Sequence, residues 1–184
     1  MTAATATARP ADRLSAIALS LSPRTMAWAA FAMLVVTALL RSFGSLETNL
    51  GDTDDATRLV QVRELLAGAP WFHPSLARLN GGVDIVSHWS RLVDVPIAAL
   101  IWVFRFVLSP PAAEIAARAA WPLAVLLPAV LILAATVNAR GGRAAVACAL
   151  AQLVFAPFAF AQFNVGRIDH HNVQILCSVG AALL

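Results

Sequence analysis

The stretch MAWAAFAMLVVTALLRSFGSL, residues 26–46, is followed after four residues by GDTDDATR, residues 51–58. The first stretch is apolar over about 20 residues, the length that a helix rising 1.5 Å per residue needs to cross a bilayer. The second stretch packs three carboxylates into four positions. Such carboxylates repel one another unless a cation, a helix N-terminus or water offsets their charge. The two stretches predict a membrane-spanning helix that leads into a polar external segment.

Composition agrees with a membrane protein. The 184 residues are 60% hydrophobic and 12% charged, with a mean hydropathy of +0.76, which is typical of α-helical membrane proteins. The 13 basic residues are all arginines, and the net charge of +3 is spread over chain ends and loops, so nucleic-acid binding has no support. Cys148 and Cys177 lie in apolar runs without CxxC spacing, so we interpret them as packing residues.

We therefore predict an all-α fold, a polytopic bundle of transmembrane helices with a long external loop that contains amphipathic or interfacial helices. Residues 1–25 are expected to form a cytoplasmic tail, and residues 26–184 the membrane domain. The length of the first apolar run favours an uncleaved anchor over a signal peptide. Crossings are expected at about 26–46, 115–137 and 144–163, with an incomplete one at 173–184.

The external loop is expected to span residues 47–114, because residues 47–94 hold seven of the ten acids. Within it, an apolar face at helical spacing predicts a helix from about Asp54 to Ala67, capped by Asp52 or Thr53 and ended at Gly68. Residues 71–91 are read as irregular chain with turns. The apolar run 96–108 is too short to span a bilayer and is interpreted as an interfacial or re-entrant helix.

This interpretation fixes the predicted topology. If residues 96–108 do not cross, the N-terminal arginines and the turn that carries Arg140 and Arg143 share the cytoplasmic side, as the positive-inside rule prefers. The acidic cluster (Asp52, Asp54 and Asp55) and a second polar cluster, GRIDHHN at residues 166–172, then share the opposite side. For a bacterial inner membrane that side is the periplasm.

A divalent cation site is the first functional hypothesis. Carboxylate oxygens suit Mg²⁺ and Mn²⁺, and Mn²⁺ also accepts imidazole, so the candidate ligands are Asp52, Asp54, Asp55, Asp169 and His171. Asp169 and His171 flank one residue, a spacing that can point two ligands inward. A cation there would neutralise a phosphate leaving group. The alternative is that these residues only cap helix N-termini, one near Asp52 and one before Val173.

Four basic side chains of the loop are candidates for contact with a substrate or lipid phosphate: Arg58, Arg63, His88 and Arg91. A planar guanidinium matches phosphate geometry. The alternative for the two helical arginines is pairing on the helix itself, with Asp54 and Glu64. For His88 and Arg91 the alternative is a role in the folding of the loop.

The order of elements and the two motifs resemble the N-terminal part of the oligosaccharyltransferase catalytic-subunit family, within the C-type polytopic glycosyltransferases. GDTDD, with the arginines after it, stands at that family's first acidic motif, and GRIDHH at its second. The resemblance implies that Asp55 and Asp169 are catalytic metal ligands and that His171 takes the place of a second acid. It also implies that the chain corresponds to the N-terminal portion of a longer fold.

The resemblance implies a metal-dependent membrane glycosyltransferase. Its donor would be a sugar or oligosaccharide on a polyprenyl phosphate or diphosphate, and its partners that lipid-linked donor and membrane lipid. The acceptor stays open among protein amide, protein hydroxyl, lipid and glycan. Two alternatives stay open as well: a non-enzymatic transporter or assembly subunit with a cation-binding loop, and a metal-dependent lipid-phosphate hydrolase.

Overall fold

The computed structural model describes residues 20–45, 47–48, 50–72, 76, 86–156 and 160–182. These residues form α2 (Pro23–Ser42), α3 (Thr53–Leu66), α4 (Arg91–Phe104), α5 (Pro110–Phe155), the 3₁₀ helix η2 (Ala161–Phe163) and α6 (His171–Ala181). No strand occurs in this part of the chain, which confirms the all-α prediction. Most of the expected tail, residues 1–19, lies outside the described residues.

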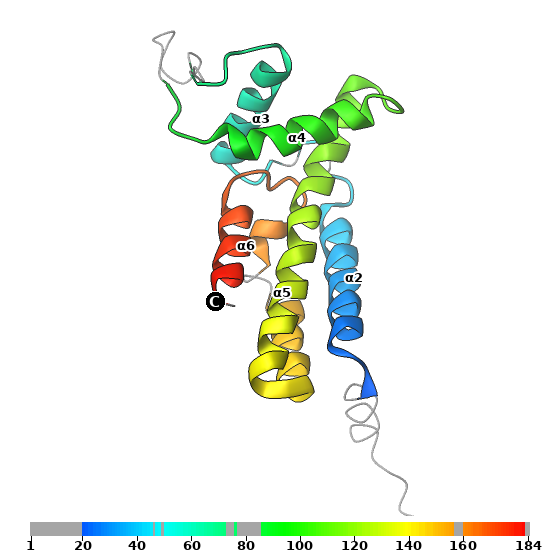
Figure 1. Cartoon of the computed structure of the whole chain (residues 1–184). Coiled ribbons are helices and arrows are strands. Elements are labelled where there is room, and N and C mark those ends of the chain that lie inside the picture. Colours follow the sequence, from blue (N-terminus) through cyan, green and yellow to red (C-terminus); the bar gives the residue numbers. More distant parts are fainter. Residues whose placement is uncertain are drawn as a thin grey trace, which may run out of the picture.

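Helix α2 packs along α5, and Figure 1 shows the two side by side. Ser22 caps α2 by accepting a hydrogen bond from the N–H of Thr25. The buried face is a row four residues apart, Met26, Ala30, Leu34 and Ala38. Rows of this spacing form the ridge that packs against a neighbouring helix, and the small alanines let α5 approach. The opposite face of α2 leaves large apolar side chains exposed.

Two helices, α2 and α5, are long and apolar enough to cross a membrane. Helix α5 consists of two antiparallel arms that turn at Gly142, seen at the lower end of the bundle in Figure 1. Gly142 has φ 68° and ψ −168°, a conformation that essentially only glycine adopts. The expected helices at 115–137 and 144–163 are therefore present as these arms, although the first begins earlier, at Pro110.

The second arm is shorter than expected. It ends at Phe155 rather than at residue 163, and Ala156 has left the helical conformation with φ −100° and ψ 89°. Pro157 follows Ala156 in the sequence, and proline disfavours a helical residue immediately before it. The chain then reaches η2 and the polar cluster, and α6 starts at His171 rather than at Val173.

The loop helices lie together at one end of the bundle (Figure 1). Helix α3 matches the expected 54–67 helix within a residue and buries the predicted face through Leu59 and Val62. Beyond it, Gly68 has φ +91°. Helix α4 begins five residues before the expected 96–108 run and crosses the end of the bundle instead of continuing it. The predicted irregular stretch falls largely on residues 73–75 and 77–85, outside the described residues.

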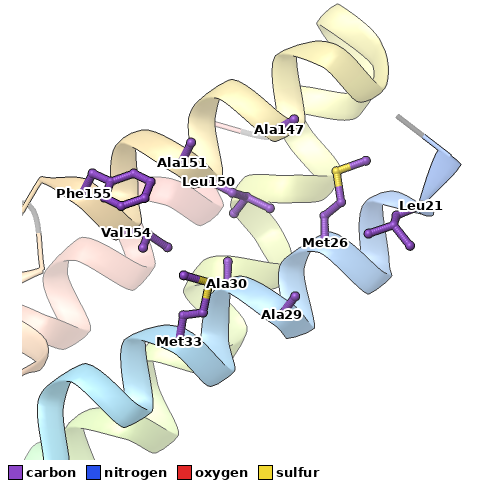
Figure 2. A pocket seen from close by; sticks show the side chains of 10 residues that line it. All are labelled: Leu21, Met26, Ala29, Ala30, Met33, Ala147, Leu150, Ala151, Val154 and Phe155. Carbon is purple, nitrogen blue, oxygen red and sulfur yellow. The ribbon is translucent and has the colours of Figure 1, made fainter. Parts of the chain in front are cut away.

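Figure 2 shows an apolar groove near the other end, between the start of α2 and the second arm of α5. Its volume is about 250 Å³, and all of its lining side chains are apolar, among them Met26, Met33, Leu150 and Phe155. Without a polar group this groove offers packing surface and no chemistry.

The length of α2 and the expected topology together predict which residues lie on each side of the membrane. Three single cysteines at exposed positions, Thr25→Cys, Thr53→Cys and Ala144→Cys, are introduced after Cys148 and Cys177 have been replaced by alanine. Intact spheroplasts are then treated with a membrane-impermeant maleimide. Because α2 is about 30 Å long at 1.5 Å per residue, a crossing by α2 would place its ends on opposite sides of a bilayer.

We expect Thr53→Cys to react and the other two cysteines to react only after permeabilisation. Equal reaction at residues 53 and 144 in intact spheroplasts would contradict the spanning arrangement.

Candidate functional site

The acidic cluster and the polar cluster meet through the carboxylate of Asp55, which is 0% exposed. Its Oδ1 accepts hydrogen bonds from the backbone N–H groups of Ile168 at 2.7 Å and Asp169 at 2.9 Å. Its Oδ2 accepts the N–H of Asp52 at 3.1 Å and lies 2.8 Å from Nη1 of Arg167. Burial raises the pKa of Asp55, and Arg167 and the two N–H groups oppose that shift. Both oxygens of Asp55 are thus occupied by protein donors.

Asp52 adds to this junction between the acidic cluster and the polar cluster from its solvent side. Its Oδ1 accepts the N–H groups of Asp54 and Asp55, and its Oδ2 pairs with Arg167. Because the Asp55 side chain accepts the N–H of Asp52 in return, Asp52 and Asp55 form a capping box at the start of α3. Burial alone would raise the pKa of Asp52, but the hydrogen bonds from Arg167 and from the N–H groups of Asp54 and Asp55 hold it below its usual value. Gly51 makes room for Arg167, because a Cβ at Gly51 would lie 2.2 Å from Cδ of that side chain.

A buried ion network lies beside this junction and ties α3 to α4. Nη1 of Arg58 donates to Oδ1 of Asp94 at 2.7 Å, and Nη1 of Arg91 donates to Oδ2 of Asp94 at 3.2 Å and to the carbonyl oxygen of Gln61 at 2.9 Å. Nη2 of Arg58 lies 3.9 Å from Oδ1 of Asp169. Arg58 therefore pairs with Asp94 rather than with Asp54, the partner expected from helical spacing.

An open cleft of about 570 Å³ lies over this network, and we call it the histidine cleft. Its lining consists of Asp54, Arg58, His88, Trp89, Ser90, Val93, His170 and His171. The Arg58 guanidinium sits 4.7 Å from the centre of the Trp89 ring, and the His170 ring lies 5.7 Å from that centre on a tilted plane. The cleft therefore joins imidazole, carboxylate, guanidinium and indole groups from three separate segments.

Asp169, His170 and His171 form the one group of potential metal ligands found among the described residues, with one ligand atom from each within 4.8 Å of the others. Oδ1 of Asp169 accepts the N–H of His170 at 2.6 Å and contacts Nδ1 of the same residue. Oδ2 of Asp169 is buried, and no hydrogen bond to it occurs in the described part of the chain. Nε2 of His171 lies 3.3 Å from this oxygen.

The tautomer of His171 follows from its other nitrogen. Nδ1 lies 2.9 Å from Oε1 of Gln174, and an amide oxygen can only accept, so Nδ1 carries the proton. Nε2 of His171 then faces the Asp169 oxygen, as a lone pair in the neutral ring or as an N–H donor in the protonated ring. Two lone pairs at this separation are favourable only with a proton or a metal cation between or beside them.

The structure separates the residues that the sequence grouped. Asp169 and His171 lie in the metal-ligand group, and Asp54 lies on the cleft lining. Asp52 and Asp55 are not among the side chains that line the cleft. Both accept backbone N–H groups and pair with Arg167.

The four phosphate candidates divide in the same way. Arg58 and His88 line the histidine cleft, whereas Arg91 is buried beneath it. Arg63 lies elsewhere: its Nε and Nη2 bind the Glu114 carboxylate at 2.7 and 2.6 Å, so its partner is Glu114 and not Glu64. The geometry therefore gives no support to a substrate contact by Arg63 or Arg91.

Sequence reasoning missed three residues of this region: Asp94, Arg167 and His170. Asp94 lies 36 positions after its partner Arg58, and Arg167 lies 115 after Asp52, so no local spacing connects them. Arg167 and His170 stand inside the quoted polar cluster, and Gly51 beside the acidic cluster marks a close approach. Those signals pointed to the right segments without giving the pairings.

No protein-family model, curated protein or solved structure matches this chain. The likeness to the oligosaccharyltransferase catalytic subunits therefore stays a prediction from the two motifs.

The junction predicts that Asp55 and Asp54 differ in their contribution to stability. Asp55→Asn keeps the side-chain shape but turns an amide N–H₂ toward Arg167 and the N–H of Asp52, and it leaves Arg167 with one carboxylate fewer. We expect it to lower the free energy of unfolding by about 3 kcal/mol.

Asp54→Asn is the matched control, since Asp54 lies one residue away. This substitution removes only the favourable interaction of a carboxylate charge with the N-terminus of α3, which is worth less than about 1 kcal/mol. Denaturant unfolding in detergent measures both variants. Equal losses would contradict the structural role of Asp55.

Proposed function

We propose that this chain forms the cation-dependent donor site of a membrane glycosyltransferase that moves a sugar or oligosaccharide from a polyprenyl phosphate or diphosphate to an acceptor. The observation that carries the proposal is the pair formed by the buried Oδ2 of Asp169 and Nε2 of His171, 3.3 Å apart at the edge of the histidine cleft. The two motifs that resemble the oligosaccharyltransferase family supply the reaction class.

The residues present fit a divalent cation. Asp169 offers a carboxylate oxygen that lacks a hydrogen bond among the described residues, and His171 offers a nitrogen oriented by Gln174. Metal-bound histidines generally donate their other N–H to such a partner, which fixes the ring and its tautomer. Mixed imidazole and carboxylate ligands favour Mn²⁺ over Mg²⁺, of the two ions expected from the sequence. A cation bound here supplies positive charge to the departing phosphate.

The other cleft residues have separate roles. Arg58 at the cleft floor adds positive charge near a bound phosphate, while Asp94 keeps its guanidinium in place. His170 contacts Asp169 through Nδ1, which leaves its Nε2 to take the proton of the acceptor. As the bond from the acceptor to the anomeric carbon forms, the bond from that carbon to the phosphate oxygen breaks and the phosphate leaves with the electron pair. Asp55 is a positioning residue, since it holds the backbone of Asp169.

Placement in a membrane has its own support. The outer face of α2 exposes Trp28, Met33, Val36 and Leu40, a surface suited to lipid. The histidine cleft is lined by residues of α3, α4 and α6, and α3 and α4 lie beyond the C-terminal end of α2 (Figure 1). We propose that the headgroup of a lipid-linked donor binds there. We propose a multi-pass arrangement in the bacterial inner membrane with the N-terminus cytoplasmic and the cleft periplasmic, which the positive-inside rule favours through Arg140 and Arg143.

The test of the metal site uses Mn²⁺ titrated into the purified full chain and followed by electron paramagnetic resonance. We expect one bound Mn²⁺, with affinity at least tenfold lower in Asp169→Asn and in His171→Gln because each removes a ligand. His88→Gln is the matched control, because His88 lines the same cleft outside the ligand group. Equal affinity in the His88 and His171 variants would rule out this site.

The test of the donor class adds polyprenyl diphosphate and follows thermal unfolding, because a ligand that binds only the folded chain raises its melting temperature. We expect stabilisation that requires Mn²⁺ and is lost in His171→Gln. Stabilisation without Mn²⁺, or none at all, would contradict the proposal. With the sugar-bearing lipid, release of free sugar to water would instead favour the hydrolase.

A further inference from the structure

A second charged cleft lies away from the histidine cleft, where α3, the end of α4 and the start of α5 come together. Its volume is about 430 Å³, and we call it the arginine cleft. Its charged lining consists of Glu47, Arg63, Arg105, Glu114 and Arg118, and its apolar lining of Pro110, Pro111 and Ile115. The cleft takes no part in the proposed transfer reaction.

The charge balance of the arginine cleft favours an anion. Three guanidinium groups face two carboxylates, and Arg63 engages one of these carboxylates with two hydrogen bonds. Arg118 is only 4% exposed, and its Nη2 donates to the carbonyl oxygen of Glu47 at 3.0 Å, which holds a positive charge in the cleft wall.

The surroundings of the cleft are apolar and exposed. Arg105 caps the C-terminal end of α4, and the side chains around it point into solvent: Trp102, Val103, Phe106, Val107 and Leu108. Trp102 and Phe106 lie one turn apart with ring centres at 4.8 Å, so they form one surface. A contiguous apolar surface next to arginines is typical of a segment that lies in a bilayer interface.

We propose that the arginine cleft binds the phosphodiester headgroup of an anionic phospholipid, whose acyl chains lie along the exposed apolar surface at the end of α4. The guanidinium groups match the phosphate oxygens, and the apolar surface matches the chains. A soluble phosphate would use only the first of these two features. The proposal requires a membrane around α2 and α5 but not the metal site or the transfer reaction.

Native mass spectrometry of the full chain in detergent tests this site with phosphatidylglycerol, phosphatidylcholine and inorganic phosphate as probes. We expect preferential retention of one phosphatidylglycerol, and an affinity for it about tenfold lower in Arg105→Gln, the factor for one lost charge-assisted hydrogen bond. Arg41→Gln is the matched control, because Arg41 is an exposed arginine in the last turn of α2, outside the cleft lining.

A second variant keeps the test independent of misfolding. Glu114→Gln removes a carboxylate from the cleft and releases Arg63, so we expect it to bind phosphatidylglycerol more tightly than the unaltered chain does. Three results would overturn the proposal: equal losses in the Arg41 and Arg105 variants, equal retention of the two phospholipids, or displacement of phosphatidylglycerol by inorganic phosphate. The last result would assign the cleft to a soluble anion.

Discussion

The carboxylate of Asp55 is the interaction on which the rest of the polar region depends. It accepts the backbone N–H groups of Ile168 and Asp169 from the segment before α6, and on its other oxygen it meets the N–H of Asp52 and the guanidinium of Arg167. A buried carboxylate is strongly unfavourable without such donors. Two of these donors, the N–H groups of Ile168 and Asp169, belong to the backbone that carries Asp169 and leads into the two histidines.

Because of this constraint, the acidic side chains of the region have different partners. Asp52 and Asp55 are occupied by capping and by Arg167, and Asp94 is occupied by Arg58 and Arg91. Asp169 keeps one buried oxygen without a hydrogen bond in the described part of the chain, and a histidine nitrogen faces it. The cleft thus has paired charges around a carboxylate with one buried oxygen that a histidine nitrogen faces, and the proposed donor site is built on that oxygen.

Local patterns predicted the helices well because helices depend on nearby residues. The cap at Asp52, the apolar face through Leu59 and the stop at Gly68 together predicted α3, and the turn that carries Arg140 and Arg143 predicted the hairpin at Gly142. The end of α5 was misplaced because apolar composition continues past Phe155, although Pro157 was a usable signal. The site was only partly predictable. Pairings such as Arg58 with Asp94 depend on how separate helices pack. For Asp55, the sequence was compatible both with a role at the helix N-terminus and with a role as a metal ligand.

The most direct test of the Asp55 junction is amide hydrogen exchange at Ile168 and Asp169, measured by NMR on the labelled chain in detergent. These amides lie outside any helix, so their protection depends on Asp55. The Asp55 junction predicts slow exchange in the unaltered chain and fast exchange at both amides in Asp55→Ala, with Leu34 in α2 unchanged as the internal control. Fast exchange at both amides in the unaltered chain, or slow exchange that persists in Asp55→Ala, would contradict it.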